Sequence, residues 1–419
     1  MVIYIGIKNL GGFMNCLIGQ SGGPTAVINS SLAGAIQAGF DFDFENVYVS
    51  LNGIEGLLHE NIKCVDKDLF EKEKAKDRLK KRPSSILGSC RFKLSDNLED
   101  DQYKKIFENL KKYEISTFVY IGGNDSMDTV MKLNSYIEKN KIDWVNVVGC
   151  PKTIDNDLCE MDHSPGFASA SKFVNTALRQ IRLDCDIYPI KSITFVEIMG
   201  RNAGWLTATS YLANYKRKKD IVNLVYLPED SKSLDDIEKE IEEKFKEDNN
   251  LVIAVSEGFM DKDGKLENES EKSFDKGFNH PIIAGIGLKI SDYIHDKLKV
   301  KTRSVELNIV QRTSFLISKT DSDEAYELGY LAIKEGKDKT NLVPILKREE
   351  KKEYKVKYST TNPSNIANKE KKIPEAWLKS REILKEKITA YTLPLIKGEI
   401  NQEFTDGIFD YIKLEDFTK

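Results

Sequence analysis

The sequence predicts an α/β protein with mostly parallel sheets that carry helices on both faces. Short apolar runs alternate along the chain with segments of helical pattern, an order typical of strand–helix–strand units. Several of the apolar runs are continuous in valine and isoleucine, as in strands that are buried on both sides. With 419 residues, the chain is long enough for two or three domains.

The expected elements follow from these patterns in chain order. Each predicted strand is a short apolar run, and these runs cover 16–19, 47–51, 117–122, 144–149, 192–199, 221–226, 251–256 and 305–310. The predicted helices lie between them, at 26–38, 126–139, 169–182, 203–213, 234–246, 282–297 and 323–334. The lysine-rich, weakly apolar segment 347–372 is expected to be an excursion or a flexible cover, and a last helix is expected over 377–387.

Composition and charge narrow the class of protein. Hydrophobic residues make up 40% of the chain and charged residues 31%, as in a globular protein with a solvated surface. A net charge of only −4 argues against a nucleic-acid binder or a membrane-surface protein. No apolar run reaches the ~18 residues of a transmembrane helix, and residues 1–13 do not resemble a signal peptide. We therefore expect a cytoplasmic protein. Residues 1–13 are expected to be an extension or to result from a start codon assigned too early.

The cysteines and histidines exclude several kinds of site. Six cysteines are scattered along the chain without a CxxC pair, which fits reduced thiols better than disulfides or a zinc site. Only four histidines are present, and none lies in a recognisable nucleophile motif. If the protein is an enzyme, carboxylates and cations must carry its chemistry.

Four loops follow predicted strands at the sheet edge where ligands bind in open parallel sheets. They read GQSGGPTAVIN after strand 16–19, GGNDSMDT after 117–122, CPKTIDND after 144–149 and MGRNAGW after 192–199. These loops hold most of the unusual polar residues, so we expect the functional site among them.

Two of these loops are glycine-rich turns into helices. Gly22 and Gly23 allow backbone N–H groups to approach an anion at a helix N-terminus. Their loop matches neither the Walker nor the dinucleotide signature, so a tight turn without a ligand is equally open. In the second loop, Asp125 can orient water around a magnesium ion, whereas the alternative is that Asn124 and Asp125 cap the helix that begins near Ser126.

The loop after strand 144–149 contains the groups that phosphoryl transfer requires. That reaction needs cations on the transferring group, a metal, and one carboxylate to accept the proton of the nucleophile. Lys152 is a cation suited to phosphate, while Asp155 and Asp157 offer a base and a ligand for metal or hydroxyl. A charged surface turn is the alternative interpretation of this stretch.

Other charged residues beside glycine or at strand ends are further candidates. Arg91 and Arg201 are isolated arginines in glycine-containing loops. Glu257 ends strand 251–256 and suits sugar hydroxyls. Arg303 and Arg312 flank strand 305–310 and can hold a second, non-reacting phosphate. The alternative for each of these residues, taken alone, is an ordinary solvated charge on the protein surface.

Taken in order, the motifs resemble those of the phosphofructokinase family. They are GGxxxxIN, GSxRF, GGxDS, PKTIDND, MGRNAGW, SEG and R-x8-R, and they extend from residue 19 to residue 312. The resemblance implies two Rossmann-like α/β domains with the active site in the cleft between them. We expect a donor-binding domain of residues 14–157 plus 313–346, a sugar-phosphate domain of residues 158–312, and a helical or irregular extension over 347–419.

The resemblance also implies roles for the motif residues. Asp155 is expected to take the proton from the C1 hydroxyl of fructose 6-phosphate, with Lys152 and Arg91 as the other catalytic groups. The residues expected to bind the donor are Gly23, Asp125, Ser126, Lys152 and Arg91. The residues expected to bind fructose 6-phosphate are Thr153, Asp155, Asp157, Met199, Gly200, Arg201, Glu257, Arg303 and Arg312. Magnesium (Mg2+) is expected on Asp125 and, through water, on Asn124.

Two positions indicate which donor is used. ATP-using relatives have glycine where this chain has Asp125 and Lys152. A carboxylate at 125 repels the α-phosphate of ATP, and a unit-charge repulsion at ~4 Å is worth ~4 kcal/mol at a dielectric near ~20, about a thousandfold in affinity. The pair resembles the pyrophosphate-dependent branch, in which transfer is reversible and serves glycolysis or gluconeogenesis.

Three departures from the family pattern concern the fine detail of the site. Asn124 stands where many relatives have a metal-orienting aspartate. Ser192, with Lys191 beside it, stands where an arginine often contacts the 6-phosphate, and Ile309 replaces a common histidine. Lys191 is a candidate substitute for the missing arginine.

The resemblance also bears on partners and on rival functions. A 6-phosphate arginine is commonly lent by a neighbouring subunit, so a homodimer or homotetramer is implied, with no nucleic acid and no membrane. One rival is an ATP-dependent phosphofructokinase that tolerates Asp125 and Lys152. The other rival is a catalytically inactive regulatory subunit that binds sugar phosphate as an effector.

Overall fold

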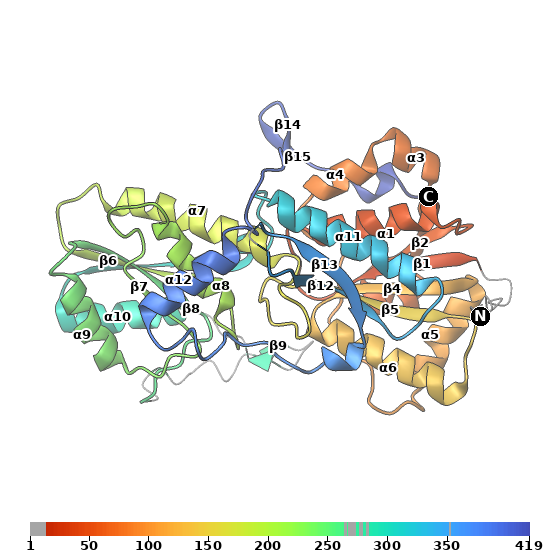
Figure 1. Ribbon diagram of the computed structural model, residues 1–419, viewed down its shortest axis with the longest axis horizontal. Coiled ribbons are helices and arrows are strands. Elements are labelled where there is room, and N and C mark those ends of the chain that lie inside the picture. Colours follow the sequence, from red (N-terminus) through yellow and green to blue (C-terminus); the bar gives the residue numbers. More distant parts are fainter. Residues whose placement is uncertain (1–13, 264–265, 267–273, 276–279, 282–284, 352) are drawn as a thin grey trace.

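The structure is a computed structural model that describes residues 14–263, 266, 274–275, 280–281, 285–351 and 353–419. The α/β class predicted from the sequence is confirmed, because the chain forms two mostly parallel sheets (Figure 1). The predicted extension 1–13 and the first residues of the predicted helix 282–297 lie outside the described residues.

The first sheet, on the right in Figure 1, consists of β1 (Asn15–Gln20), β2 (Val47–Ser50), β3 (Ile62–Cys64), β4 (Ile115–Gly122) and β5 (Asn146–Pro151). Its strand order is β3-β2-β1-β4-β5, and only β3 runs antiparallel to its neighbour. Successive residues of β1 face opposite sides: Leu17 packs in one apolar cluster, while Cys16 and Ile18 pack in another. Burial on both faces explains why these strands are continuously apolar in sequence.

Helices cover both faces of the first sheet. On one side lie α2 (Gly53–Leu58), α5 (Asp101–Lys112) and α6 (Asn124–Asn140). The other side is covered by α1 (Ile28–Asp41), α3 (Lys67–Lys72), α4 (Ala75–Lys81) and α11 (Lys319–Gly336).

The second sheet consists of β6 (Ser192–Ile198), β7 (Leu224–Tyr226), β8 (Asn250–Ser256) and β11 (Lys301–Glu306). Its strand order is β11-β6-β8-β7, and all its pairs are parallel. One face packs on α7 (Phe167–Cys185), α8 (Trp205–Ala208), the 3-10 helix η1 (Thr209–Asn214) and α12 (Arg381–Thr392). The other face packs on α9 (Leu234–Lys244) and α10 (Ile286–Leu298).

The remaining elements are short. They are the antiparallel pairs β9 (Phe274–Asp275) with β10 (His280–Pro281), β12 (Val343–Arg348) with β13 (Val356–Thr361), and β14 (Glu403–Thr405) with β15 (Ile408–Asp410). The described residues also form the 3-10 helices η3 (Asn308–Gln311), η4 (Pro363–Asn365) and η5 (Leu414–Asp416). The segment 347–372, expected as a flexible cover, thus contains β13 and η4.

Other expected elements are displaced or divided. The strand expected at 305–310 is wrong: the structure has β11 at Lys301–Glu306, followed by η3. β11 is an edge strand with exposed polar positions, so it lacks the apolar run that marks a buried strand. The helix expected at 203–213 is divided into α8 and η1, and the last helix begins only at Arg381, where the Ser380 side chain accepts a hydrogen bond from the backbone N–H of Ile383.

α11 packs along α1, which returns the chain to the first sheet after the second has been completed. The two helices approach at glycines, because a Cβ on Gly34 would lie 2.0 Å from the carbonyl oxygen of Tyr326. A Cβ on Gly329 would lie 1.9 Å from the carbonyl oxygen of Ser31.

The expected domain bounds stay a prediction. Among the helices that the structure describes, none is both long and apolar enough to span a bilayer.

Candidate active site

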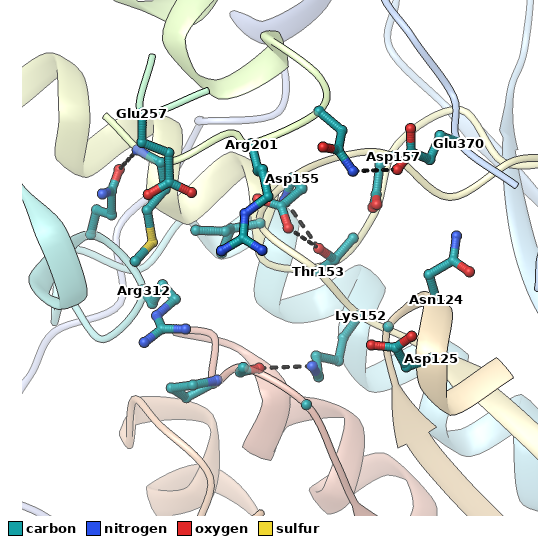
Figure 2. A pocket seen from close by; sticks show the side chains of 18 of the residues that line it. Asn124, Asp125, Lys152, Thr153, Asp155, Asp157, Arg201, Glu257, Arg312 and Glu370 are labelled. Atoms are coloured by element: carbon teal, nitrogen blue, oxygen red, sulfur yellow. Dashed lines mark hydrogen bonds between the residues drawn. The ribbon is translucent and has the colours of Figure 1, made fainter. Parts of the chain in front are cut away.

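A cavity of about 910 Å³ is lined by loops that follow strands of both sheets. Figure 2 looks into it from close by. The predicted site residues that line it are Gly23, Arg91, Asn124, Asp125, Ser126, Lys152, Thr153, Asp155, Asp157, Met199, Arg201, Glu257 and Arg312. Gly200 and Arg303 are not among the described residues that line it.

The loop between β1 and α1 lies against two cations. The Nζ atom of Lys152 donates a hydrogen bond of 2.7 Å to the carbonyl oxygen of Gly23. A Cβ at Gly22, where φ is +75°, would lie 3.0 Å from that Nζ. A Cβ at Gly23 would lie 3.0 Å from Nη1 of Arg312. The two glycines therefore leave the space that these cations occupy.

The loop after β5 turns sharply at the buried Asn156. Asn156 has a φ of 56°, a left-handed conformation that asparagine tolerates better than most residues. Its Nδ2 donates to Oη of Tyr391 at 2.9 Å, and its Oδ1 accepts from the backbone N–H of Ser164 at 3.0 Å. One turn earlier, Thr153 Oγ1 accepts from the Asp155 backbone N–H at 3.1 Å and donates to Asp155 Oδ2 at 3.2 Å. These bonds hold the Asp155 carboxylate in the cavity (Figure 2).

Burial moves the ionisable groups of the cavity towards their neutral forms. It lowers the pKa of Lys152 to about 8, although the charge of Asp155 acts in the opposite direction. Burial also raises the pKa of Asp155. Together with the charge of Asp155, burial raises the pKa of Asp157 to about 7 and that of Glu257 to about 7. Groups that titrate near neutral pH are typical of sites that move protons.

The cavity carries more carboxylates than cations. The lysine and arginine side chains among its described lining residues are Arg91, Lys152, Arg201 and Arg312. The carboxylates are Asp125, Asp157, Asp155, Glu197, Glu257, Glu306 and Glu370. An anionic substrate that enters this cavity therefore requires further positive charge, which a divalent cation supplies.

The oxygen atoms at one end of the cavity fit a magnesium ion. Mg2+ usually takes one or two carboxylates and completes its shell with water and substrate phosphates. Asp125, in the first turn of α6, and Asp157 provide carboxylates there. Oδ1 of Asp157 is buried and has no hydrogen-bond partner within the described part of the chain. No cage of three or more His, Cys, Asp or Glu side chains occurs among the described residues.

Asn124, predicted to hold magnesium through water, is engaged by the C-terminal part of the chain. Its Nδ2 donates to the carbonyl oxygen of Lys369 at 2.5 Å, and its Oδ1 accepts from the backbone N–H of Asn368 at 2.6 Å. The structure thus gives Asn124 a second task, and its contact with magnesium stays a prediction.

The other end of the cavity is formed by the loop after β6. Gly200 has a φ of 140°, and a Cβ there would lie 2.9 Å from the carbonyl oxygen of Ala203. Gly200 therefore shapes the loop without lining the cavity. The backbone N–H of Met199 donates to Oε1 of Gln311 at 3.2 Å, which ties this loop to η3. Glu257 follows β8 and lines this end.

Of the two arginines predicted to bind a second phosphate, Arg312 lines the cavity of its own chain. Its Nε is buried and has no hydrogen-bond partner within the described residues, so this donor is available to an anion. Arg303 lies outside the cavity, on β11, where it pairs with Asp184 at 2.6 Å and its side chain is 43% exposed. Lys191, the candidate substitute, also lies elsewhere, with Nζ 5.0 Å from the centre of the Phe245 ring.

The cavity also contains residues that the sequence reasoning did not select. They are Pro24, Ile154, Glu197, Ile198, Asn202, Glu306, Asn308, Gln311, Asn368 and Glu370. Most are neighbours of the recognised motifs or lie at the ends of β6 and β11, where proximity to a motif was a usable signal. Asn368 and Glu370 come from the lysine-rich segment, which offers no such signal.

These groups can carry out one kind of chemistry particularly well. Lys152 and Arg312 present positive charge to the cavity, and Asp155 is a buried carboxylate with a raised pKa that can accept a proton. Cations, a metal position and one base are the parts that phosphoryl transfer uses.

The fold and the site together define a phosphotransferase of the phosphofructokinase family. The model of the family described as phosphofructokinase matches residues 15–334, and the chain belongs to this family. A pyrophosphate–fructose 6-phosphate 1-phosphotransferase of Halomonas elongata is 33% identical over 408 residues, which cover 96% of each chain. The solved structure of a pyrophosphate-dependent phosphofructokinase from Nitrosospira multiformis matches with a TM-score of 0.84 and 28% identity, over 97% of this chain and 98% of that one.

Another relative carries a different name. A sulfofructose kinase of Alkalicoccus urumqiensis is 31% identical over 324 residues, which cover 77% of this chain and 80% of that protein. Membership of the family therefore establishes a phosphotransferase acting on a sugar phosphate or a similar sugar, and the particular substrates need a separate argument.

Proposed function

We propose that this chain transfers a phosphoryl group from inorganic pyrophosphate to the C1 hydroxyl of D-fructose 6-phosphate. The products are fructose 1,6-bisphosphate and phosphate. Because a phosphoanhydride donor is exchanged for a phosphate ester with release of phosphate, we expect the reaction to be reversible and to serve glycolysis or gluconeogenesis. The relatives from Halomonas elongata and Nitrosospira multiformis, which carry the names of pyrophosphate-using enzymes, support this proposal.

The observation that carries the proposal is the pair Lys152 and Asp125. Lys152 is buried in the cavity, bonded to the Gly23 carbonyl, and faces the carboxylate of Asp155. An ammonium group at this depth neutralises a compact donor or its departing phosphate. Asp125 lies at the start of α6 in the same cavity, where its negative charge repels the additional phosphate of ATP.

In the proposed reaction, Asp155 accepts the proton of the C1 hydroxyl, held for this by its two bonds with Thr153. The C1 oxygen then forms a bond to one phosphorus of pyrophosphate while the bridging P–O bond breaks. Lys152 and Arg91 neutralise the charge on the departing phosphate. Arg201, Arg312 and Glu257 hold the sugar phosphate at the other end of the cavity.

Magnesium is proposed as the cofactor, with Asp125 and Asp157 as the residues that would hold it. When bound, it supplies positive charge to the phosphate oxygens, which the carboxylate-rich cavity lacks on its own. The chain's own contribution is to orient the two substrates and to accept the proton.

A donor exchange tests this proposal. The variant with both Asp125→Gly and Lys152→Gly removes the repulsion of ATP and the cation that suits pyrophosphate. We expect kcat/KM with pyrophosphate to fall and kcat/KM with ATP to rise, so that the preference shifts towards ATP, with each single variant shifting it less. A double variant whose ratio of the two kcat/KM values equals that of the wild type would contradict the proposal.

Three alternatives are separated by a substrate panel. ATP-dependent phosphofructokinase activity would appear as turnover with ATP at the same magnesium concentration. A regulatory subunit would bind fructose 6-phosphate and turn over neither donor, but this chain retains Asp155, Asp157, Arg91 and Arg201 in the cavity. A preference for sulfofructose over fructose 6-phosphate would instead favour the activity named for the Alkalicoccus urumqiensis relative.

We also propose that the chain works as a homodimer or homotetramer. The exposed position of Arg303, outside the cavity of its own chain, supports a role in a neighbouring subunit. A cytoplasmic location remains a prediction from the sequence.

A further inference from the structure

Residues 368–371, here called the strap, cross the wall of the cavity from one sheet's loops to the other's. At one end, the strap exchanges two backbone hydrogen bonds with the Asn124 side chain at the start of α6. At the other end, Nε1 of Trp205 in α8 donates to the carbonyl oxygen of Lys371 at 2.8 Å. The strap is therefore held by elements that flank both sides of the cavity.

The middle of the strap is fixed to the loop after β5. The backbone N–H of Lys371 donates to the carbonyl oxygen of Asp157 at 2.7 Å. Nζ of Lys371 donates to the carbonyl oxygen of Asp162 at 2.8 Å and to Oδ1 of Asn156 at 3.2 Å. Nδ2 of Asn368 donates to Oδ1 of Asp128 in α6 at 2.8 Å. So many backbone and side-chain bonds leave the strap little freedom to move.

Glu370 is the residue of the strap whose carboxylate lines the cavity. Its Oε1 accepts a hydrogen bond of 2.6 Å from Nδ2 of Asn202. Figure 2 shows it beside Asp157, on the side of the cavity that holds Asn124. Its negative charge also contributes to the raised pKa of Asp157, after burial and the charge of Asp155. The carboxylate therefore acts on the electrostatics of this end of the cavity.

We propose that Glu370 is a specificity-determining residue that, together with Asp125, limits the donor to two phosphates. The inference rests on the proposed function, in which this end of the cavity takes pyrophosphate. The sugar end is marked by Glu257 and the transfer point by Asp155 and Lys152, so a longer donor must extend towards Asp125 and Glu370 (Figure 2). A third phosphate there meets two carboxylates, one of them held by Asn202.

The test compares equilibrium binding of two inorganic probes, pyrophosphate and tripolyphosphate, at equal free magnesium. Glu370→Gln removes the charge and keeps the shape, while Glu370→Asp keeps the charge. Glu375→Gln removes a charge at an exposed position outside the cavity and is the matched control. Calorimetry of each variant with both probes gives the ratio of their dissociation constants.

The expected result is that Glu370→Gln strengthens tripolyphosphate binding about tenfold relative to pyrophosphate, as removal of one charge–charge repulsion of about 1.4 kcal/mol predicts. Glu370→Asp and Glu375→Gln should keep the wild-type ratio. Thermal melting of each variant shows that it is folded. The inference is overturned if the ratio in folded Glu370→Gln equals that of the wild type, or if Glu375→Gln changes it equally.

A separate turnover assay of the wild type distinguishes failure of the proposed function from failure of this inference. A wild-type protein that turns over ATP and not pyrophosphate would contradict the proposed donor. The ratio of the two dissociation constants needs no turnover, so the effect of Glu370 on a third phosphate is still measured in that case.

Discussion

At the scale of single residues, burial has opposite effects on the two central charges of the site. It raises the pKa of the Asp155 carboxyl and lowers the pKa of the Lys152 ammonium to about 8. A carboxylate whose pKa is closer to neutral is a stronger base. A lysine whose pKa lies near neutral pH gains and loses its proton readily. A bound phosphate would favour the charged form of Lys152.

Replacement of Asp155 tests its assignment as the base. We expect Asp155→Ser to lower kcat by a factor of about 10² to 10⁴, the usual contribution of general base catalysis, and to leave the affinity for fructose 6-phosphate largely intact. Steady-state kinetics and calorimetry measure the two effects. Asp143→Ser, at an exposed position before β5, is the matched control. Wild-type-like kcat in the Asp155 variant would exclude this role.

The charge of Lys152 predicts a pH dependence. Its pKa of about 8 lies below the ordinary value, so the free enzyme loses this positive charge as the pH rises through about 8. We expect kcat/KM for pyrophosphate to fall there, and Lys152→Arg to move the fall to higher pH because arginine stays protonated. If kcat/KM of an active Lys152→Arg variant falls at the same pH as that of the wild type, Lys152 is not the group whose titration causes the fall.

The sequence could predict most of the site at this scale, because its polar residues sit in specific motifs after strands. Lys152, Asp155 and Asp157 follow β5 directly, and the structure brings them to one cavity. Glu370 could not be predicted, since nothing in a lysine-rich segment indicates that folding returns it to the loop after β5. Arg303 was assigned to the sugar phosphate, but its exposed position within one chain leaves that role untested.

At the scale of elements, the contact between α1 and α11 depends on glycine. A Cβ at position 329 would lie 1.9 Å from the carbonyl oxygen of Ser31, so the helices must separate to accept one. We expect Gly329→Ala to lower the free energy of unfolding by about 1–3 kcal/mol, as overpacking does, although alanine favours helices. Denaturant unfolding measures it, with the exposed Glu327→Ala on the same helix as the control. An unchanged free energy of unfolding would show that the two helices adjust freely.

Strands buried on both faces could be predicted from sequence, and strands without such burial could not. β4 and β8 are buried throughout and mostly apolar, and the predicted strands overlap them. β11 is an edge strand with polar residues, so the apolar run that overlaps its end predicts a strand in the wrong place. The strap is irregular backbone held by long-range hydrogen bonds, and no local periodicity encodes such contacts.

At the scale of the whole molecule, a buried ionic network joins distant segments of the chain. Nδ1 of His163 lies 2.8 Å from Oδ2 of Asp162, and its Nε2 lies 2.7 Å from Oε2 of Glu324 in α11. Arg348 of β12 contacts Asp162 at 3.0 Å, and Oη of Tyr354 donates to Oε1 of Glu324 at 2.5 Å. The network ties the segment after the β5 loop to α11 and the β12–β13 pair.

This network predicts how stability depends on pH. Burial alone would lower the pKa of His163, but the charge of Glu324 and the bonds to both carboxylates raise it to about 9. Because this is above the unfolded value, the stabilisation is complete below pH ~6.5 and is lost as the pH rises through about 9, by about 3 kcal/mol in total. Lys152 and Lys371, whose pKa values are lowered to about 8, change stability in the opposite direction.

The contribution of His163 is therefore measured as a difference. Urea unfolding of the wild type and of His163→Gln, each at pH 6 and pH 10, gives the free energy that depends on this residue. We expect the gap between the two proteins to narrow at the higher pH. A gap of constant size would mean that His163 is not protonated between its carboxylates.

The central claim, that pyrophosphate is the donor, is tested most directly by one donor panel on the purified wild-type protein. The formation of fructose 1,6-bisphosphate from fructose 6-phosphate is followed with pyrophosphate and with ATP at equal free magnesium. The charge of Asp125 predicts that kcat/KM with pyrophosphate exceeds that with ATP by about a thousandfold. Equal use of both donors, or a preference for ATP, would contradict the account.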